Sequence, residues 1–200
     1  GKAANGFICF TQFNEGLDDA APWISSILPS RKSDRVFLGT SRGIYSGVPG
    51  SSAWKEYQST SRLKINQIAY ADPEERKILI AAEEGLFRLN PDNDTILKLK
   101  TGIYNEGVSS VITTAGRSFA GTGMGVFTST DKGDSWTIFT EGLPYLAVNS
   151  FTAFGSDLYC ATEKGIYRLD LAGSAWEPVS PDFNRDLSVI SSGLPASLFT

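Results

Sequence analysis

The stretch SFAGTGMGVF at residues 118–127 occurs in related form four times along the chain. The other copies read VFLGTSRGIY at 36–45, ILIAAEEGLF at 78–87 and LYCATEKGIY at 158–167. Each copy contains a short apolar segment, a pair of small residues, a two-residue turn, a glycine and an aliphatic–aromatic pair. The aligned glycines are Gly43, Gly85, Gly125 and Gly165, which lie 42, 40 and 40 residues apart. A period of this length is typical of a repeat architecture.

Each repeat is predicted to form four short strands. In the third repeat we expect them near 108–113, 117–121, 125–129 and 135–139, in segments rich in aromatic and β-branched residues. No segment has a sustained apolar period of about 3.6 residues, as an amphipathic helix would. A four-stranded unit that repeats every forty residues or so predicts a β-propeller.

The two ends of the chain predict how the ring closes. Residues 187–190 and 197–200 resemble the first two strands of a further repeat, and residues 6–8 resemble its continuation. We therefore expect one all-β domain over residues 1–200, with five four-stranded blades and the last blade shared between the N- and C-termini. Pairing of this kind removes exposed strand edges. Two alternatives stay open, which are a segment of a larger propeller and a four-bladed ring with short extensions.

The composition excludes several functions. The formal net charge is −4 and the chain has no histidine, so we expect neither nucleic-acid binding nor a histidine-based catalytic triad. No apolar run approaches the roughly 18 residues of a membrane span, and we expect no membrane insertion, no cofactor and no metal site. Asp92, Asn93 and Asp94 do not form a complete calcium loop. Cys9 and Cys160 lie in apolar runs and are predicted to be buried free thiols, with a disulfide between them as the alternative.

One segment resembles a known repeat family. The sequence STDKGDSW at 129–136 matches the Asp-box, Ser-x-Asp-x-Gly-x-x-Trp, of BNR-repeat propellers, and the other repeats carry degenerate versions. Proteins with such repeats include sialidases, sortilin-type receptors, xyloglucan-cleaving glycosidases, photosystem II assembly factors and the sensor propellers of hybrid two-component regulators. They share a fold and not a function. The resemblance implies that Asp131, Gly133 and Trp136 determine the fold and are not site residues.

No catalytic residue is predicted. A sialidase-like site needs an arginine cluster, and the arginines here share no repeat position beyond Arg88 and Arg168, for which a structural role is expected. A glycosidase needs only two carboxylates. Glu83, Glu84, Glu141 and Glu163 are available, but their spacing marks no pair.

A ligand is expected at the end of the propeller that carries the turns between second and third strands and the connections between blades. Aromatic side chains on such loops suit stacking and interface contacts. The predicted ligand-binding residues are Arg42, Glu84, Tyr104, Met124, Tyr145, Lys164, Phe183 and Arg185.

The sequence thus predicts a non-catalytic propeller that binds a protein or a glycan through this loop face. The alternatives are a glycan-cleaving hydrolase of the Asp-box type and a segment of a larger sensor propeller. The sequence does not determine the compartment, although an extracellular or periplasmic one is favoured.

Overall fold

Four antiparallel sheets of four strands each make up the described part of the computed structural model, which comprises residues 17, 23–51, 54–99, 107–144 and 147–179. In every sheet the strands are ordered as they follow in the chain. The first blade holds β1 (Ile24–Pro29), β2 (Val36–Thr40), β3 (Gly43–Gly47) and β4 (Lys55–Glu56), and the second holds β5 (Ile65–Tyr70), β6 (Ile78–Ala82), β7 (Gly85–Asn90) and β8 (Thr95–Lys98). The third blade holds β9 (Val108–Thr114), β10 (Arg117–Thr122), β11 (Gly125–Ser129) and β12 (Thr137–Ile138), and the fourth holds β13 (Val148–Phe154), β14 (Asp157–Thr162), β15 (Gly165–Asp170) and β16 (Glu177–Pro178). One short 3-10 helix, η1 (Gln58–Thr60), follows β4.

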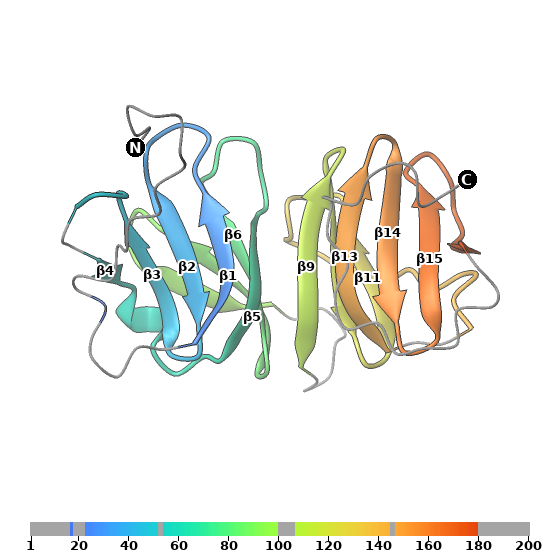
Figure 1. The fold of residues 1–200 in the computed structure, drawn as a ribbon, viewed down its shortest axis with the longest axis horizontal. Coiled ribbons are helices and arrows are strands. Elements are labelled where there is room, and N and C mark those ends of the chain that lie inside the picture. Colours follow the sequence, from blue (N-terminus) through green and yellow to red (C-terminus); the bar gives the residue numbers. More distant parts are fainter. Residues whose placement is uncertain (1–16, 18–22, 52–53, 100–106, 145–146, 180–200) are drawn as a thin grey trace, which may run out of the picture.

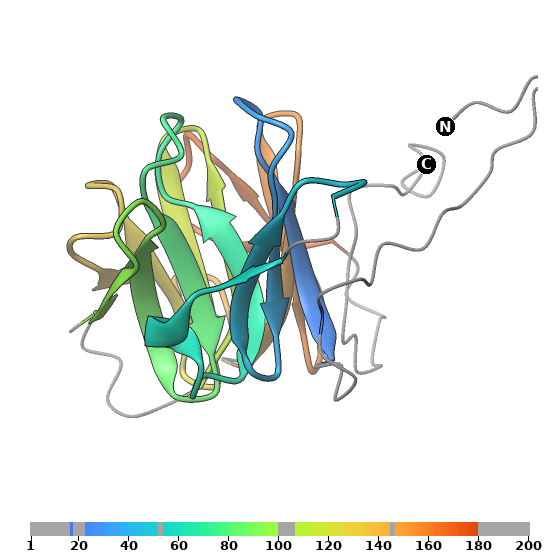
Figure 2. The same ribbon diagram turned by 90° about the vertical axis from the view of Figure 1, so that its left-hand side faces the viewer.

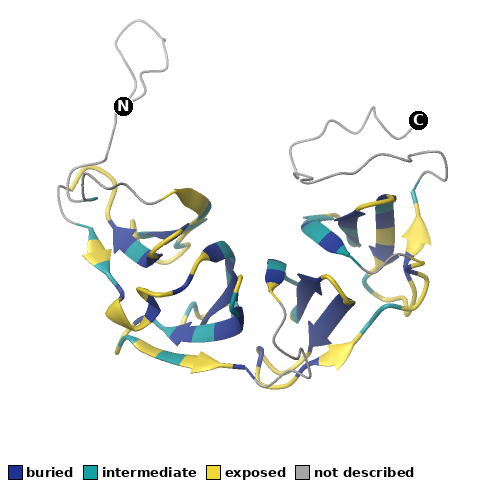
Figure 3. Ribbon diagram, turned by 90° about the horizontal axis from the view of Figure 1, so that it is seen from below, coloured by how far each residue is buried: buried dark blue, intermediate teal, exposed yellow. Residues whose placement is uncertain are grey.

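The four sheets lie side by side along an arc, which Figure 1 shows from the side and Figure 3 from one end. The first strands β1, β5, β9 and β13 contact one another in this order. Figure 2 shows the strong twist of the sheets between their first and fourth strands, which is the twist expected of short antiparallel sheets. This arrangement is that of propeller blades around a common axis.

The all-apolar strand β6 shows why a sheet in this arc has two hydrophobic faces. Successive side chains of a strand point to opposite faces. Ile78 and Ile80 therefore pack in the cluster shared with the first blade, whereas Leu79 and Ala81 pack in the cluster shared with the third. All five residues of β6 are buried, because both faces of the second blade are covered. The described part has three such clusters, one between each pair of neighbouring blades.

Polar side chains at β-bulges join the first strands of neighbouring blades. In each first strand the pairing register shifts at the second residue. In three blades the side chain at this position donates a hydrogen bond to a backbone carbonyl of the next blade. The donor–acceptor pairs are Ser25–Ile65, Asn66–Val108 and Ser109–Val148. The bulges thus set the spacing of the blades around the axis.

The predicted strands of the third repeat are confirmed, except that the fourth is shorter than expected. It begins at Thr137, because Ser135 and Trp136 belong to the preceding turn. Cys160 is a buried free thiol, while Cys9 lies outside the described residues. The strands predicted at 6–8, 187–190 and 197–200 also lie outside them, so the five-bladed closure stays a prediction.

Candidate functional site

The turns between second and third strands gather at one end of the arc, at the bottom of Figure 1 and facing the reader in Figure 3. The first strands begin at the same end, because Ile24 pairs with Thr40 and Val148 pairs with Thr162 at the ends of β2 and β14. We call this end, with its turns and its blade-to-blade connections, the turn face.

A threonine at the end of the second strand fixes the turn in three of the four described blades. The Oγ1 atom of Thr122 donates to the carbonyl oxygen of Gly125 (3.0 Å) and accepts from the backbone N–H of Met124 (3.0 Å). Thr40 and Thr162 make the same pair of hydrogen bonds in their blades. The glycine has a φ of 122° in the third blade, a conformation that glycine adopts at little cost. The residue before this glycine is therefore held at the tip of a rigid turn.

The second blade fixes its turn in a different way, because Ala82 replaces the threonine. Here the Glu84 carboxylate accepts from the backbone N–H of Lys64, at 3.4 and 3.2 Å to its two oxygens. The Lys64 ammonium in turn contacts the Glu83 carboxylate at 3.0 Å. This hydrogen bond, together with the charge of Glu83, raises the pKa of Lys64. Glu83 and Glu84 are thus engaged in contacts with the start of β5.

The structure places four of the eight predicted ligand-binding residues on the turn face. Arg42, Glu84, Met124 and Lys164 each occupy the tip of a turn in a different blade. Arg42, Met124 and Lys164 are exposed and Glu84 is half-buried. The other four predicted residues, Tyr104, Tyr145, Phe183 and Arg185, lie outside the described residues.

Trp23 is a feature of the turn face that the sequence prediction missed. It directly precedes β1 and its exposed fraction is 85%. Its backbone is bonded to the turn of its own blade, since Ser41 N–H donates to the Trp23 carbonyl (2.9 Å) and Trp23 N–H donates to Ser41 Oγ (3.1 Å). The repeat alignment contained a weak signal for it, because the matching residue of the second blade, Lys64, is of a type common at a protein surface.

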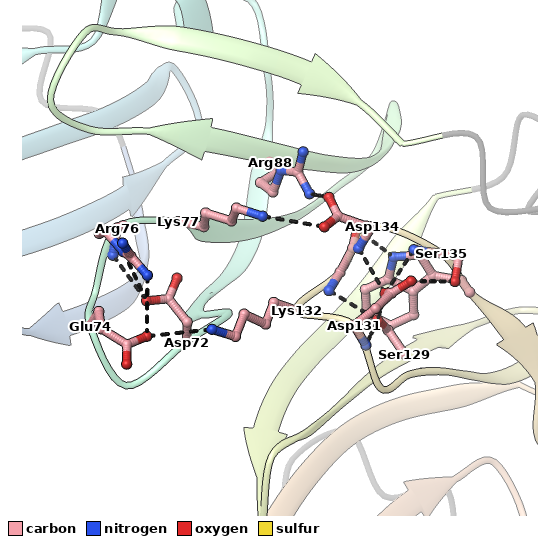
Figure 4. Close-up of polar contacts among 12 residues, drawn as sticks. Asp72, Glu74, Arg76, Lys77, Arg88, Ser129, Asp131, Lys132, Asp134 and Ser135 are labelled. Atoms are coloured by element: carbon pink, nitrogen blue, oxygen red, sulfur yellow. Dashed lines mark hydrogen bonds and ion pairs between the residues drawn. The ribbon is translucent and has the colours of Figure 1, made fainter.

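The segment 129–136, which resembles an Asp-box and is called the Asp-box turn below, forms a compact turn at the opposite end, between β11 and β12 (Figure 4). The Asp131 carboxylate accepts from the backbone N–H groups of Asp134 (3.0 Å) and Ser135 (2.8 Å), and from the hydroxyls of Ser135 (2.5 Å) and Ser129 (2.7 Å). Ser129 Oγ also accepts from Gly133 N–H (2.9 Å). These hydrogen bonds, led by that from the Ser135 hydroxyl, hold the pKa of Asp131 well below its ordinary value.

The same turn joins the third blade to the second. Trp136 is buried and donates through Nε1 to the Gly133 carbonyl (3.2 Å), and it shares a hydrophobic cluster with Leu79 and Leu99 of the second blade. A Cβ atom at Gly133 would lie 2.7 Å from Leu79 Cδ2, so no larger residue fits without a shift. The packing explains why the motif needs both a glycine and a tryptophan.

Ion pairs reinforce this contact between the second and third blades (Figure 4). Asp134 contacts Arg88 and also Lys77, the latter at 3.4 Å, and Lys132 lies 3.6 Å from Glu74. Hydrogen bonding to Arg88 is the main cause of the lowered pKa of Asp134. Arg168, in the fourth blade, is paired with Glu177 (2.9 Å). Arg88 and Arg168 are therefore engaged in contacts of a structural kind.

The described residues offer no group of three histidine, cysteine, aspartate or glutamate side chains that could hold a metal ion. Asp94, in the turn between β7 and β8, accepts hydrogen bonds from Gln58 N–H (3.1 Å) and Ser59 Oγ (2.7 Å), which follow β4 of the first blade. Within the same residues, no helix has the length and apolar character needed to cross a membrane.

Comparisons with known proteins define the class of fold. No protein-family model and no curated protein matches the chain. Among solved structures, it is similar to the extracellular domain of the hybrid two component system BT4673 from B. thetaiotaomicron, with a TM-score of 0.69 and 17% identity over 88% of this chain and 23% of that one. It is also similar to an ancestral GH74 enzyme, with a TM-score of 0.66 and 17% identity over 81% of this chain and 26% of that one. The WD40 repeats of RRP9 are similar as well, with a TM-score of 0.64 and 11% identity over 81% of this chain and 52% of that one.

These similarities show an all-β, repeat-built fold of the propeller type. The identities are too low to carry a function over. The chain spans about a quarter of the length of the first two of these structures.

Proposed function

We propose that this propeller is a non-catalytic binding module that recognises a protein or a glycan through its turn face, with Arg42, Glu84, Met124 and Lys164 at the turn tips among its contact residues. The observation that carries the proposal is the 85% exposure of Trp23 on that face. Lys64 and Gly107 occupy the matching position in the second and third blades, and both are exposed although a blade flanks them on each side. A residue at this position is thus exposed in two blades that are flanked on both sides, whereas Ala147 at the matching position of the fourth blade is half-buried.

The described carboxylates favour binding over hydrolysis. A general acid of a glycosidase needs a raised pKa. Glu74, Asp131 and Asp134 do not meet this requirement, because hydrogen bonding lowers the pKa of each of them. Glu83 and Glu84 on the turn face are engaged by Lys64. The similarity to a GH74 enzyme at 17% identity concerns the fold, and hydrolysis is kept as the alternative outcome of the experiment below.

The experiment presents the purified 200-residue chain to a glycan array and a peptide array, and compares it with Trp23→Ala. Arg31→Glu, at the opposite end of the first blade, is the control. We expect a ligand that the chain retains, that Trp23→Ala loses and that the control keeps. A ligand unaffected by Trp23→Ala would exclude the turn face. Release of reducing sugar ends from a bound polysaccharide would exclude a non-catalytic role.

We further propose that the domain spans residues 1–200 and closes as a five-bladed ring, with the fifth blade formed by the two ends of the chain. Ile24 and Ile27 of β1 are 46% and 65% exposed, whereas the matching Ile65 and Ile68 of β5 are 3% and 4% exposed. The difference arises because the first blade covers β5 and no described blade covers β1. A further sheet would bury the apolar face of β1, as it does in every other described blade.

Ile27→Arg tests this closure, with light scattering used to measure the oligomeric state. If a fifth blade covers Ile27, the arginine destabilises a monomeric protein by several kcal/mol, as an unpaired buried charge does. An unchanged unfolding midpoint would show that this face is free. A concentration-dependent dimer that Ile27→Arg dissolves would show that a second copy covers it.

A further inference from the structure

Three exposed residues of the first blade and of the connection that follows it lie on the turn face, namely Trp23, Arg42 and Arg62. The backbone of Trp23 is hydrogen-bonded to Ser41, the neighbour of Arg42. We call these three residues the indole–guanidinium patch.

Arg62 is held in the patch by the connection that follows η1. Thr60 Oγ1 accepts from Ile44 N–H at 2.8 Å, directly after the turn that carries Arg42, and Leu63 N–H donates to the Thr60 carbonyl at 2.9 Å. Thr60 itself is fully buried. The segment around Arg62 is therefore anchored to the turn that carries Arg42, as the backbone of Trp23 is.

The two arginines of the patch bring positive charge that the described residues do not neutralise. Neither Arg42 nor Arg62 lies within 4.0 Å of a described carboxylate, whereas Arg76, Arg88 and Arg168 are all paired. A guanidinium group binds carboxylates through a planar fork of donors and also stacks on flat groups. The patch therefore offers two carboxylate-binding forks beside one exposed indole ring.

The shape of the patch points to a macromolecular surface as its ligand. Small ligands are bound in concave sites that enclose most of their surface. An indole that is 85% exposed lines no such cavity. Tryptophan and arginine are the residues most enriched among the side chains that dominate protein–protein binding energy. Trp23 and the two arginines are exposed, and the arginines are opposite in charge to an acidic chain, so these residues suit a docking surface.

We propose that the indole–guanidinium patch docks an acidic segment of a protein partner that contains an aromatic residue, which stacks on Trp23 while its carboxylates bind Arg42 and Arg62. This inference rests on the proposed binding function of the turn face and specifies its partner. Glu83 and Glu84 of the neighbouring turn repel an acidic segment, so they confine it to the first blade. Because the chain as a whole carries a net charge of −4, attraction is local and is screened by salt.

The experiment measures binding of a fluorescein-labelled random copolymer of glutamate and tyrosine by fluorescence anisotropy at low and high salt. Polygalacturonate, an anionic glycan without aromatic groups, is the competing probe. We expect the 200-residue chain to bind the copolymer, and Arg42→Glu/Arg62→Glu to weaken binding at least tenfold. Trp23→Ala should weaken it to a similar extent, and higher salt should weaken it in the wild type.

Arg31→Glu/Arg35→Glu is the matched control. It makes the same change of charge at two exposed arginines of the same blade that form no ion pair with a described carboxylate. They lie at the opposite end, where the described residues include no neighbouring exposed indole. We expect this variant to bind as the wild type does. An equal loss in both double variants would overturn the inference, because net charge alone would then explain the binding.

The other outcomes separate this inference from the proposed function. Absence of copolymer binding by the wild type overturns the inference, while loss of an array ligand in Trp23→Ala would still support the turn face as a binding site. Preference for polygalacturonate overturns the protein partner in favour of an anionic glycan. Dimerisation that Arg42→Glu/Arg62→Glu abolishes, seen by light scattering, assigns the patch to a second copy of this chain and also overturns the inference.

Discussion

The threonine that fixes three of the four described turns allows a quantitative test of how the turn face is built. Thr122 is 1% exposed, and its Oγ1 atom makes two hydrogen bonds of 3.0 Å inside the turn. Thr122→Val keeps the size and the branching of the side chain but removes both bonds. At about 1 kcal/mol for each neutral hydrogen bond, the free energy of unfolding should fall by about 2 kcal/mol.

Thr122→Ser provides the comparison that makes this prediction specific. Serine keeps the hydroxyl and loses one buried methyl group, which is worth roughly 0.8 kcal/mol. Valine should therefore cost more than serine. For a chain of this size, 1 kcal/mol corresponds to roughly 2–4 °C in Tm, so Thr122→Val should lower Tm by roughly 4–8 °C.

Urea unfolding followed by tryptophan fluorescence measures both variants, provided that the slope of the transition is unchanged. If Thr122→Val is as stable as the wild type and Thr122→Ser is less stable, burial of the methyl group and not hydrogen bonding stabilises the turn. The account of the turn given above would then be wrong.

Two further predictions concern other parts of the blades. Gly142→Ala should destabilise the fold by more than about 2 kcal/mol, because its Cβ would lie 2.0 Å from the Trp176 carbonyl oxygen at a φ of 82°. Gly155→Ala is the control, since a Cβ there meets nothing within 4 Å at a φ of 60°, and it should cost only about 1 kcal/mol. Equal losses of stability in urea unfolding would contradict the interblade contact. The pKa of Asp131 is lowered in the folded state from an ordinary value of 3.8, so its contribution to stability is complete well above pH 3.8 and is lost as the pH falls below that value. Asp131→Asn should therefore reduce the loss of stability between pH 7 and pH 3, and unfolding curves at the two pH values with an unchanged difference would show that the carboxylate is not responsible.

Local pattern alone was enough to predict the blades. The repeated glycines 40 to 42 residues apart located the turns between second and third strands, and the strand positions of the third repeat followed from them. The prediction succeeded because alternation of side chains and turn glycines are properties of a few neighbouring residues. The fourth strand of that repeat was predicted too long, since the Asp-box turn extends to Trp136 through hydrogen bonds that the strand propensity of the segment does not reveal.

The candidate site was predicted only in part. Arg42, Met124 and Lys164 were placed correctly at exposed turn tips, because each precedes the turn glycine. Glu84 was placed in the right turn, but its carboxylate is bonded to the backbone of Lys64, a residue twenty positions earlier. Neither Trp23 nor Arg62 was among the predicted site residues. Trp23 is bonded to Ser41, and the segment before Arg62 is bonded through Thr60 to Ile44, two contacts between distant residues that no local pattern encodes.

The sequence by itself thus determined the class of fold, the length of the repeat and the end of the blades that carries the turns, because these depend on side-chain alternation and on one turn glycine in a short motif that recurs every 40 to 42 residues. Only the tertiary structure decided which side chains meet across blades. The Asp-box turn pairs with Arg88 and Lys77 of the preceding blade, and the indole–guanidinium patch assembles residues almost forty positions apart. Contacts of this kind depend on the spacing and twist of whole sheets, which the bulge hydrogen bonds and the shared hydrophobic clusters set.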